Sequence, residues 1–327
     1  MDTATVELKK LNTTAIDVIV DKITVESPSV KSFQLKAADG SKLPHFSGGS
    51  HITTRVQSEH ELLERHYSLT NDIDQNEYYQ IAVGRNTHSK GGSVYWHDKI
   101  KEGDQLEISY PKNHFPLSFR AKHHVFIAAG IGITPFIAMA SSLKKQGKSF
   151  ELHYAAPSKE LCAFHSFLSS TYPDETNFYF SRTDRRMTTE VMKNQPIGTH
   201  VYFCGTEGMV REFSEAAKSY GYPDSSIHFE LFTPPDFGPL YAFEVKLNQS
   251  NKVLQVPEGE TLLDVLLENG IDAPYSCKVG GCGSCQVDVL DGEVDHRDTF
   301  LTDEEKKEAN VILTCVSRAN GCVAIDL

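Results

Sequence analysis

The run Cys277-Lys-Val-Gly-Gly-Cys282-Gly-Ser-Cys285, with Cys315 thirty positions beyond it, is the most informative stretch of this 327-residue chain. Its spacing, C-x4-C-x2-C followed by a distant cysteine, is that of plant-type [2Fe–2S] sites. Four thiolates must converge on two irons, so three come from one tight loop and one from a distant strand. Glycines at 280, 281 and 283 let backbone N–H groups turn toward the sulfurs. The stretch predicts a redox cluster with four ligands: Cys277, Cys282, Cys285 and Cys315.

Two other interpretations of these cysteines are a zinc site and disulfides. Structural zinc sites usually combine two C-x2-C-like pairs, and the second pair is missing here. We expect no disulfides, because the first residues lack the basic segment and apolar stretch of a secretory signal. Cys322, seven residues past Cys315, competes for the fourth ligand position. Cys162 lies far away in sequence and is interpreted as a small buried apolar residue.

Composition and charge exclude several functional classes. Hydrophobic residues make up 39% of the chain, and no run of 18 apolar residues predicts a membrane span, so we expect a cytoplasmic protein. The net charge of −12 argues against nucleic acid as a partner. Residues 240–327 hold 16 acidic and 7 basic residues, so this quarter carries −9 of the total. Solubility explains such a surface, and so does docking to a basic redox partner.

The first 120 residues read as many short strands separated by turn signals such as Asp39-Gly40 and Gly91-Gly92. This pattern predicts an antiparallel β-barrel, with a β-sandwich as the alternative. A short helix is expected over Val94–Asp98. The expected strands are Ala15–Val25, Val30–Leu35, Tyr78–Val83 and Gln105–Ile108.

Residues 121–232 alternate strands with helices, which predicts a parallel sheet covered on both faces. The expected strands are His124–Ala129, Phe150–Ala155, Phe178–Ser181 and His200–Cys204. The expected helices are Phe136–Gln146, Cys162–Tyr172, Thr188–Lys193 and Glu207–Tyr220.

A linker is expected over residues 233–240, which begin Thr-Pro-Pro-Asp-Phe-Gly-Pro, and a smaller α+β domain over 241–327. That domain carries the cysteine cluster. Its expected elements are a hairpin of Ala242–Leu247 with Lys252–Val256, a helix over Thr261–Glu268, and strands at Cys285–Leu290 and Ile312–Arg318.

Two strand ends in the second segment carry the signature of a nucleotide site. Gly130-Ile-Gly132-Ile-Thr134-Pro135 joins an apolar strand to a helix, and its glycines would let a diphosphate approach the helix N-terminus. Pro135 suits the first helical turn. Cys204-Gly205 ends a second apolar strand in the same way. Either turn also occurs without a ligand, but ligands bind beyond the carboxyl ends of parallel strands, and two such ends support each other.

Two elements of the first segment have the chemistry of a cofactor site. In Arg65-His66-Tyr67-Ser68 the arginine could pair with a phosphate and the tyrosine could stack on a flat ring, although an ordinary alternating strand explains the tetrapeptide better when it is taken alone. Gly91-Gly92-Ser93 opens the short helix and could bind phosphate through backbone N–H groups, or be a plain turn.

The order of these motifs resembles that of the phthalate dioxygenase reductase family. Its members include vanillate demethylase reductases and carnitine monooxygenase reductases, which serve Rieske-type oxygenases. The resemblance spans nearly the whole chain and extends to residues 111–117, 228–232 and 295–298. It implies an FMN-binding barrel, an NAD(P)-binding α/β domain and a C-terminal ferredoxin domain, in a protein that is often a monomer.

The resemblance also implies a role for individual residues. Arg65, His66, Tyr67 and Ser68 would line the flavin, Ala82, Val83 and Gly84 would border its ring, and Gly91, Gly92 and Ser93 would hold its phosphate. Gly130, Gly132, Thr134 and Pro135 would shape the nicotinamide site together with Cys204 and Gly205, and Phe232 would approach the flavin.

The electron count explains why three groups are needed. Nicotinamide gives two electrons as a hydride, the cluster accepts one, and a flavin can take two and release them singly. The ribose of the nucleotide should fall near Arg182 and Asp184. Asp184 would bind the free 2′-OH of NADH, whereas the arginines around it could accept the 2′-phosphate of NADPH. NADH is expected, as is usual in the family.

Two further functions are compatible with these motifs. One is a reductase for another acceptor such as a diiron oxygenase, although many of those reductases carry the ferredoxin domain first. The other is a non-catalytic sensor that binds a partner according to the state of its cluster. The full set of flavin and nucleotide motifs favours the oxygenase reductase.

Overall fold

The computed structural model describes residues 15–57, 62–86, 91–183 and 186–327. The chain falls into two compact units, Met1–Phe229 and Glu230–Leu327. The first unit contains one antiparallel and one parallel sheet, and the second contains a third sheet with the cysteine loop. The domain boundaries given above stay predictions. Among the described residues, no helix is long and apolar enough to cross a membrane.

The antiparallel sheet of the first unit closes on itself as a barrel. Its strands run in the order β4-β3-β6-β1-β2-β5, and a bridge between Leu69 and Ile81 joins the two edge strands. A core that includes Phe33, Leu35 and Trp96 fills it. The strands are β1 (Ala15–Ser27), β2 (Val30–Ala37), β3 (His51–Gln57), β4 (Leu62–Ser68), β5 (Tyr79–Gly84) and β6 (Gln105–Ser109), and α1 (Gly92–Asp98) follows β5.

The second sheet of this unit is parallel where β10, β7, β8 and β9 pair, as the strand–helix alternation predicted. Its order is β11-β10-β7-β8-β9. The strands are β7 (His123–Ala129), β8 (Ser149–Ala156), β9 (Thr176–Phe180), β10 (Thr199–Cys204) and β11 (Ile227–Glu230). The helices are α2 (Thr134–Lys145), α3 (His165–Thr171) and α4 (Glu207–Ser219), with short 3-10 turns η1 (Gly130–Ile133), η2 (Thr189–Met192) and η3 (Asp224–Ser226).

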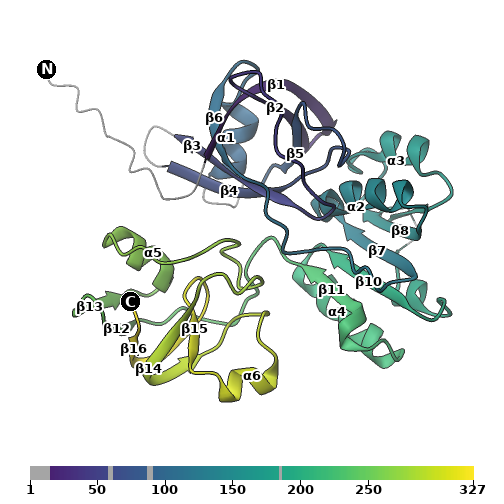
Figure 1. Ribbon diagram of the computed structural model, residues 1–327. Coiled ribbons are helices and arrows are strands. Elements are labelled where there is room, and N and C mark those ends of the chain that lie inside the picture. The colour runs from purple at the N-terminus through teal and green to yellow at the C-terminus, as the bar shows by residue number, and fades with distance from the viewer. Residues whose placement is uncertain (1–14, 58–61, 87–90, 184–185) are drawn as a thin grey trace, which may run out of the picture. The chain divides into compact units, whose positions relative to one another are not determined.

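Helices cover both faces of the parallel sheet because its strands are apolar on both sides. Phe126 of β7 stacks on Phe136 of α2, with ring centroids 4.9 Å apart. Phe203 of β10 points to the opposite face and meets Phe213 of α4 edge-on, at 6.1 Å. Figure 1 shows α2 and α4 on opposite sides of β7 and β10.

The barrel packs directly onto α2 within the first unit. A Cβ added at Gly48 would lie 2.8 Å from Cα of Met139, so the loop before β3 touches the helix backbone. The ammonium of Lys145, at the end of α2, forms ion pairs with Asp72 and Asp74 of the barrel. Both sheets therefore hold their expected cofactor residues within one compact unit.

The second unit is an α+β fold around a five-stranded sheet in the order β13-β12-β16-β14-β15. Its buried core combines Phe243, Leu262 and Ile312 with two of the cysteines, Cys285 and Cys315. The strands are β12 (Phe243–Leu247), β13 (Lys252–Val256), β14 (Gln286–Asp295), β15 (Val311–Leu313) and β16 (Arg318–Ile325), and the helices are α5 (Leu262–Glu268) and α6 (Asp303–Glu308).

Three expected elements differ in detail. The strand expected over Ile312–Arg318 is wrong, because the chain turns after β15 and the N–H groups of Val316 and Ser317 both bond back to the carbonyl of Leu313. Cys315 therefore lies in a turn. The helix expected over Cys162–Tyr172 starts only at His165, and the one expected near Thr188 is a 3-10 turn.

Candidate redox site

The seam of the barrel brings Arg65 of β4 against the start of α1. A Cβ at Gly92 would lie 2.6 Å from Nε of Arg65, so only glycine allows the guanidinium to lie there. Nη1 of Arg65 donates to the carbonyl of Glu64 at 2.7 Å, which fixes the side chain along its own strand. Two motifs that are far apart in sequence, Arg65–Ser68 and Gly91–Ser93, thus meet in space.

The other residues of the β4 motif are held by neighbours inside the barrel. Nδ1 of His66 lies 2.9 Å from the hydroxyl of Thr53. Tyr67 packs edge-on against Trp96 with ring centroids 5.6 Å apart, and burial raises the pKa of its phenol, so it stays neutral. Ser68 is buried next to the closing bridge.

The end of β5 lies beside the nucleotide turn. Ala82 and Val83 are buried, and the carbonyl of Val83 is 2.8 Å from Nε2 of His97 in α1. Burial lowers the pKa of His97, so a neutral ring that donates to this carbonyl is the consistent tautomer. A Cβ at Gly84 would lie 3.4 Å from Cγ1 of Ile131 in η1. The expected flavin edge and the expected nicotinamide site are therefore adjacent.

The turns that follow the two predicted strands contact each other through backbone atoms. β7 and β10 are parallel neighbours, with Ala128 opposite Cys204. A Cβ at Gly132 would lie 2.2 Å from the carbonyl oxygen of Cys204 and 2.8 Å from the nitrogen of Gly205. Gly132 is thus required at this position, and it joins the turn after β7 to the turn after β10.

The entry into α2 is fixed by further contacts. Gly130 has a φ of 56°, the left-handed region that favours glycine. Its carbonyl accepts a hydrogen bond from the hydroxyl of Tyr154 at 3.0 Å. Thr134 is buried and its hydroxyl donates to the carbonyl of Ile131 at 3.0 Å, while Pro135 occupies the first turn of α2 as predicted.

Of the other predicted residues, one lies in the turn after β9, one lies outside the described residues and one belongs to the second unit. Arg182 is exposed in the turn after β9, where its backbone N–H donates to the carbonyl of Pro157 at 3.0 Å. Asp184 falls outside the residues that the structure describes. Phe232 belongs to the second unit with 42% of its surface exposed, and its approach to the flavin stays a prediction.

The four cysteines gather in the second unit. Sγ of Cys285 lies 3.2 Å from Sγ of Cys315, and the thiol of Cys277 is hydrogen-bonded to those of Cys282 and Cys315. These bonds, helped by backbone N–H groups at 279 and 281, lower the pKa of Cys277. Cys322 instead lies in β16, with its sulfur 3.5 Å from Glu244. Within the described residues, no three His, Cys, Asp or Glu side chains are spaced to hold one metal ion.

The cysteine loop is shaped by close backbone approaches. Gly280 and Gly283 have φ values of 76° and 72°. A Cβ at Gly280 would lie 2.7 Å from Val316, and one at Gly283 would lie 2.5 Å from the ring of Phe300. The buried carboxylate of Asp298 accepts the N–H groups of Phe300 and of the residue after it, at 3.1 and 2.7 Å. These contacts fix the loop at Gly280 and Gly283 and fix the segment that packs on it.

Three family models match successive parts of the chain. An oxidoreductase FAD-binding domain matches residues 17–116. The N-terminal domain of a dimethylamine monooxygenase subunit DmmA-like family matches residues 111–227. A 2Fe-2S iron-sulfur cluster binding domain matches residues 245–320, the part that holds the four cysteines.

The relatives match across nearly their full length. The chain is 37% identical to the carnitine monooxygenase reductase subunit of Acinetobacter baumannii, over 93% of this chain and 95% of that protein. It is 36% identical to the vanillate O-demethylase oxidoreductase of Acinetobacter baylyi, over 95% and 98%. It is equally similar to the heme-dependent oxidative N-demethylase beta subunit of Ectopseudomonas mendocina, 36% over 96% and 99%.

Among solved structures, phthalate dioxygenase reductase superposes with a TM-score of 0.78 at 32% identity, covering 96% of this chain and 98% of that one. The chain belongs to the phthalate dioxygenase reductase family. It is an NAD(P)H-dependent flavin and iron–sulfur oxidoreductase with an antiparallel flavin-binding sheet, a parallel sheet and a C-terminal ferredoxin domain, as predicted.

The cysteine set of this reductase fits a cluster on its own geometry. All four thiols are free, and Cys285 and Cys315 are only 2% exposed. A tetrahedral metal with metal–sulfur bonds of about 2.3 Å holds two sulfurs about 3.8 Å apart. The pair at 3.2 Å would need to open by only about half an ångström.

Sequence reasoning missed the residues that hold these sites together. Ile131 and Tyr154 position the reductase's nucleotide turn, and neither carries a motif of its own. In the ferredoxin domain they are two buried arginines, Arg297 and Arg318, which are 5% and 1% exposed. Arg297 lies in the stretch 295–298 that carries the family resemblance, but no role was expected for either residue, because an arginine is usually a surface residue.

Proposed function

We propose that this reductase passes electrons from NADH through FMN and a [2Fe–2S] cluster to a Rieske-type oxygenase of the carnitine, vanillate or phthalate kind. When bound, FMN accepts a hydride as two electrons and delivers them singly, which is the form that the cluster can take. The observation that carries the proposal is the junction of Gly84 with Ile131, where flavin and nicotinamide residues adjoin. The substrate of the oxygenase would contact only the oxygenase.

The barrel residues supply binding and orientation. The guanidinium of Arg65 and the backbone of Gly91, Gly92 and Ser93 would hold the FMN phosphate, since arginine forms charge-assisted bonds to phosphate oxygens. Tyr67 would cover the ring, and His66 and Ser68 would stand beside it. Ala82, Val83 and Gly84 would border it through backbone atoms. Neither FMN nor FAD is favoured by the domain match alone, and FMN is proposed from the family resemblance.

The residues of the parallel sheet place the nicotinamide. Gly130, Gly132 and Pro135 would let the dinucleotide approach α2, and Thr134, Cys204 and Gly205 would meet its nicotinamide end. Arg182 and Asp184 would lie at the ribose, and we propose NADH as the donor. The chain needs no acid or base for this step, because catalysis consists of holding two flat rings in contact.

The ferredoxin domain carries the outgoing electron. Cys277, Cys282, Cys285 and Cys315 would ligate the cluster, and the acidic surface of residues 240–327 would attract a basic patch on the oxygenase. We propose that the protein works as a monomer in the cytoplasm, where NADH is available.

A heme protein is the second candidate acceptor. The relative from Ectopseudomonas mendocina is named as a subunit of a heme-dependent N-demethylase, and it matches as closely as the vanillate enzyme does. The two proposed functions differ only in the protein that accepts the electrons, so an experiment that distinguishes them must compare the two acceptors.

An anaerobic titration of the purified protein with NADH tests the electron path. We expect flavin and cluster absorption to bleach together, and NADPH to act more slowly. A flavin that NADH leaves oxidised would refute the path from nucleotide to cluster. Rieske and heme oxygenases added to the reduced protein would then identify the acceptor by which of them reoxidises it.

A further inference from the structure

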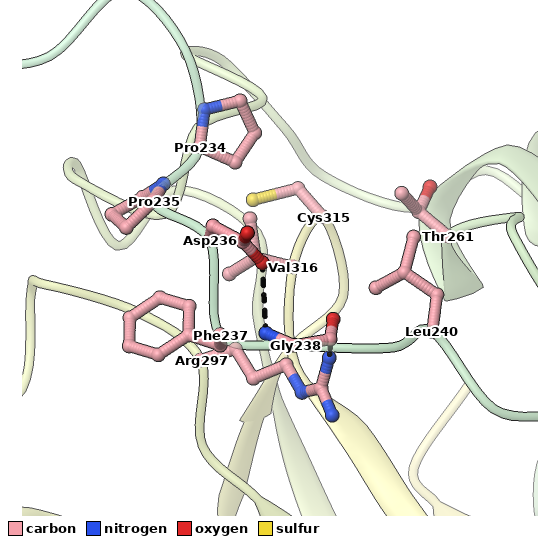
Figure 2. A pocket seen from close by; sticks show the side chains of 10 residues that line it. All are labelled: Pro234, Pro235, Asp236, Phe237, Gly238, Leu240, Thr261, Arg297, Cys315 and Val316. Atoms are coloured by element: carbon pink, nitrogen blue, oxygen red, sulfur yellow. Dashed lines mark hydrogen bonds between the residues drawn. The ribbon is translucent and has the colours of Figure 1, made fainter. Parts of the chain in front are cut away.

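The segment that leads into the ferredoxin domain forms a wall over one cluster ligand. Pro234, Pro235, Phe237 and Leu240 line a cavity of about 180 Å³ whose floor is Cys315 and Val316. Figure 2 shows the two prolines and Phe237 on one side of this cavity and Cys315 opposite. Behind this wall the thiol of Cys315 is only 2% exposed. The segment Pro234–Leu240 is called the wall below.

Arg297 clamps the middle of the wall. Its Nη1 donates to the carbonyl of Gly238 at 3.2 Å, and its Nε donates to Oδ2 of Asp295 at 2.7 Å. Figure 2 shows this guanidinium reaching Gly238 beneath the cavity. The N–H of Gly238 also donates to the carboxylate of Asp236 at 2.9 Å, which tightens the turn.

Arg318 holds the chain immediately after the wall and the turn that faces it. Its three donor nitrogens bond to the carbonyls of Tyr241, Glu260 and Pro257, at 2.6, 2.6 and 3.0 Å. The ring of Tyr241 lies beneath both guanidinium groups, 5.2 Å from that of Arg297 and 5.7 Å from that of Arg318. Its hydroxyl donates to Asp295, the same carboxylate that holds Arg297.

These contacts require the protein to bury two charged arginines, and burying a charge is energetically unfavourable. Such contacts are unusual for a segment that only connects domains. A connecting segment needs no fixed conformation, whereas a wall does. We propose that Arg297 and Arg318 are positioning residues that fix the wall over Cys315, so that water is kept from this sulfur and the reduction potential of the cluster stays low. The inference rests on the proposed role of Cys315 as a ligand.

The direction of the effect follows from charge. The cluster becomes more negative when it takes up an electron, and water near a ligating sulfur stabilises that form. Opening the wall should therefore raise the potential toward less negative values. Losing a positive charge near the cluster should do the reverse. The sign of the shift thus separates a wall that excludes water from a simple charge effect.

Two variants of the full-length protein loosen the wall without removing charge. Arg297→Lys keeps the cation, but a single ammonium cannot bridge Asp295 and Gly238 as the planar fork does. Phe237→Ala shortens a wall side chain that is 44% exposed, so the fold does not depend on it. Val253→Ala is the matched control, because Val253 is exposed on β13 and does not line the cavity.

The measurements are the cluster's reduction potential, from an EPR-monitored titration, and its rate of bleaching by a chelator. We expect both wall variants to shift the potential upward and to lose the cluster about threefold faster, with Val253→Ala unchanged. Wild-type values in both variants, or a downward shift in either, overturn the inference. A wild-type protein purified with iron but without cluster absorption would instead refute the proposed function.

Discussion

The nucleotide edge of the first unit and the surroundings of the cysteine loop in the second both bring distant segments into close contact, but only in part by the same means. At the nucleotide edge the contact depends on missing side chains, since Gly132 rests directly on the carbonyl of Cys204. The cysteine loop also contains glycines in close approaches, at 280 and 283, but the second unit adds side chains to them, since Arg297 and Arg318 reach across to backbone carbonyls of the segment that leads into the domain.

The difference follows from what each site must do. A nucleotide has to enter and leave, so we expect its site at an open edge of the sheet, where backbone atoms at the strand ends are accessible. A cluster stays bound, so its loop can be surrounded by a fixed shell. The comparison suggests that both sites are sensitive to added atoms, and that the second is also sensitive to the loss of hydrogen bonds.

The largest expected effect separates the two sites completely. Cys315→Ser should abolish the cluster, because a hydroxyl replaces a thiolate ligand, while NADH should still bleach the flavin. Cys322→Ser is the matched control and should keep the cluster, since Cys322 lies by Glu244 and not by Cys285. Iron content and visible absorption measure both outcomes. A cluster that survives in Cys315→Ser but not in Cys322→Ser would reverse the assignment of the fourth ligand.

The converse experiment adds one carbon at the nucleotide edge. Gly132→Ala places a Cβ 2.2 Å from the carbonyl oxygen of Cys204, so the turn must move. We expect flavin reduction by NADH to slow about a hundredfold, since misplacement by about 1 Å has effects of that size. The cluster should remain, and stopped-flow absorbance gives the rate.

Gly208→Ala is the control for this substitution, because nothing lies within 4 Å of a Cβ there. Its rate of flavin reduction should equal that of the wild type. If both alanine variants were equally fast, the close approach at Gly132 would have no role in placing the nucleotide.

The same contrast explains what could be predicted from the sequence. Glycines at strand ends can be identified from the sequence, because glycine is the residue that permits left-handed backbone and close approaches. Gly130, Gly132 and Gly205 were all predicted to be site residues for this reason. The cysteine spacing is visible for a similar reason. The antiparallel class of the first sheet and the parallel class of the second were predicted from turns and periodicity, and the ferredoxin domain from the cysteine spacing and the family resemblance.

What stayed hidden depends on long-range partners. Arg318 bonds to carbonyls 58 to 77 residues away, and no local pattern names a carbonyl as its partner. The turn at Cys315 was mistaken for a strand because Val311–Leu313 and Arg318–Ile325 are both strands, and the gap between them, Thr-Cys-Val-Ser, contains the β-branched residues that are common in strands. The contact of Gly92 with Arg65 likewise could not be predicted from the sequence and is seen only in the structure.

A smaller effect is expected when a hydrogen-bonded arginine is lost from the second unit. Arg318→Met keeps the apolar stem but leaves three backbone carbonyls without their donor. This should lower the free energy of unfolding of the ferredoxin domain by on the order of 3 kcal/mol. Thermal unfolding of the full chain, followed by cluster absorption, measures it. Lys246→Met, at an exposed position on β12, should unfold like the wild type.

The smallest predicted effect concerns the parallel sheet and depends on pH. His124 of β7 and His228 of β11 stack on either side of Tyr202, with centroids 5.8 and 4.4 Å from its ring. Burial lowers the pKa of each to about 4, and the nearby His200, whose Nδ1 is 2.9 Å from Nε2 of His228, adds to the effect. The folded protein therefore keeps these rings neutral.

The unfolded chain binds protons at these histidines near pH 6.5, whereas the folded chain does so only near pH 4. Stability of the first unit should thus be constant above pH 7 and fall between pH 6.5 and 4, by on the order of 2 kcal/mol per histidine. Chemical denaturation followed by flavin fluorescence measures the slope. His124→Phe keeps an aromatic ring at this position and should reduce the slope of stability against pH. An unchanged slope would mean that other groups carry the pH dependence.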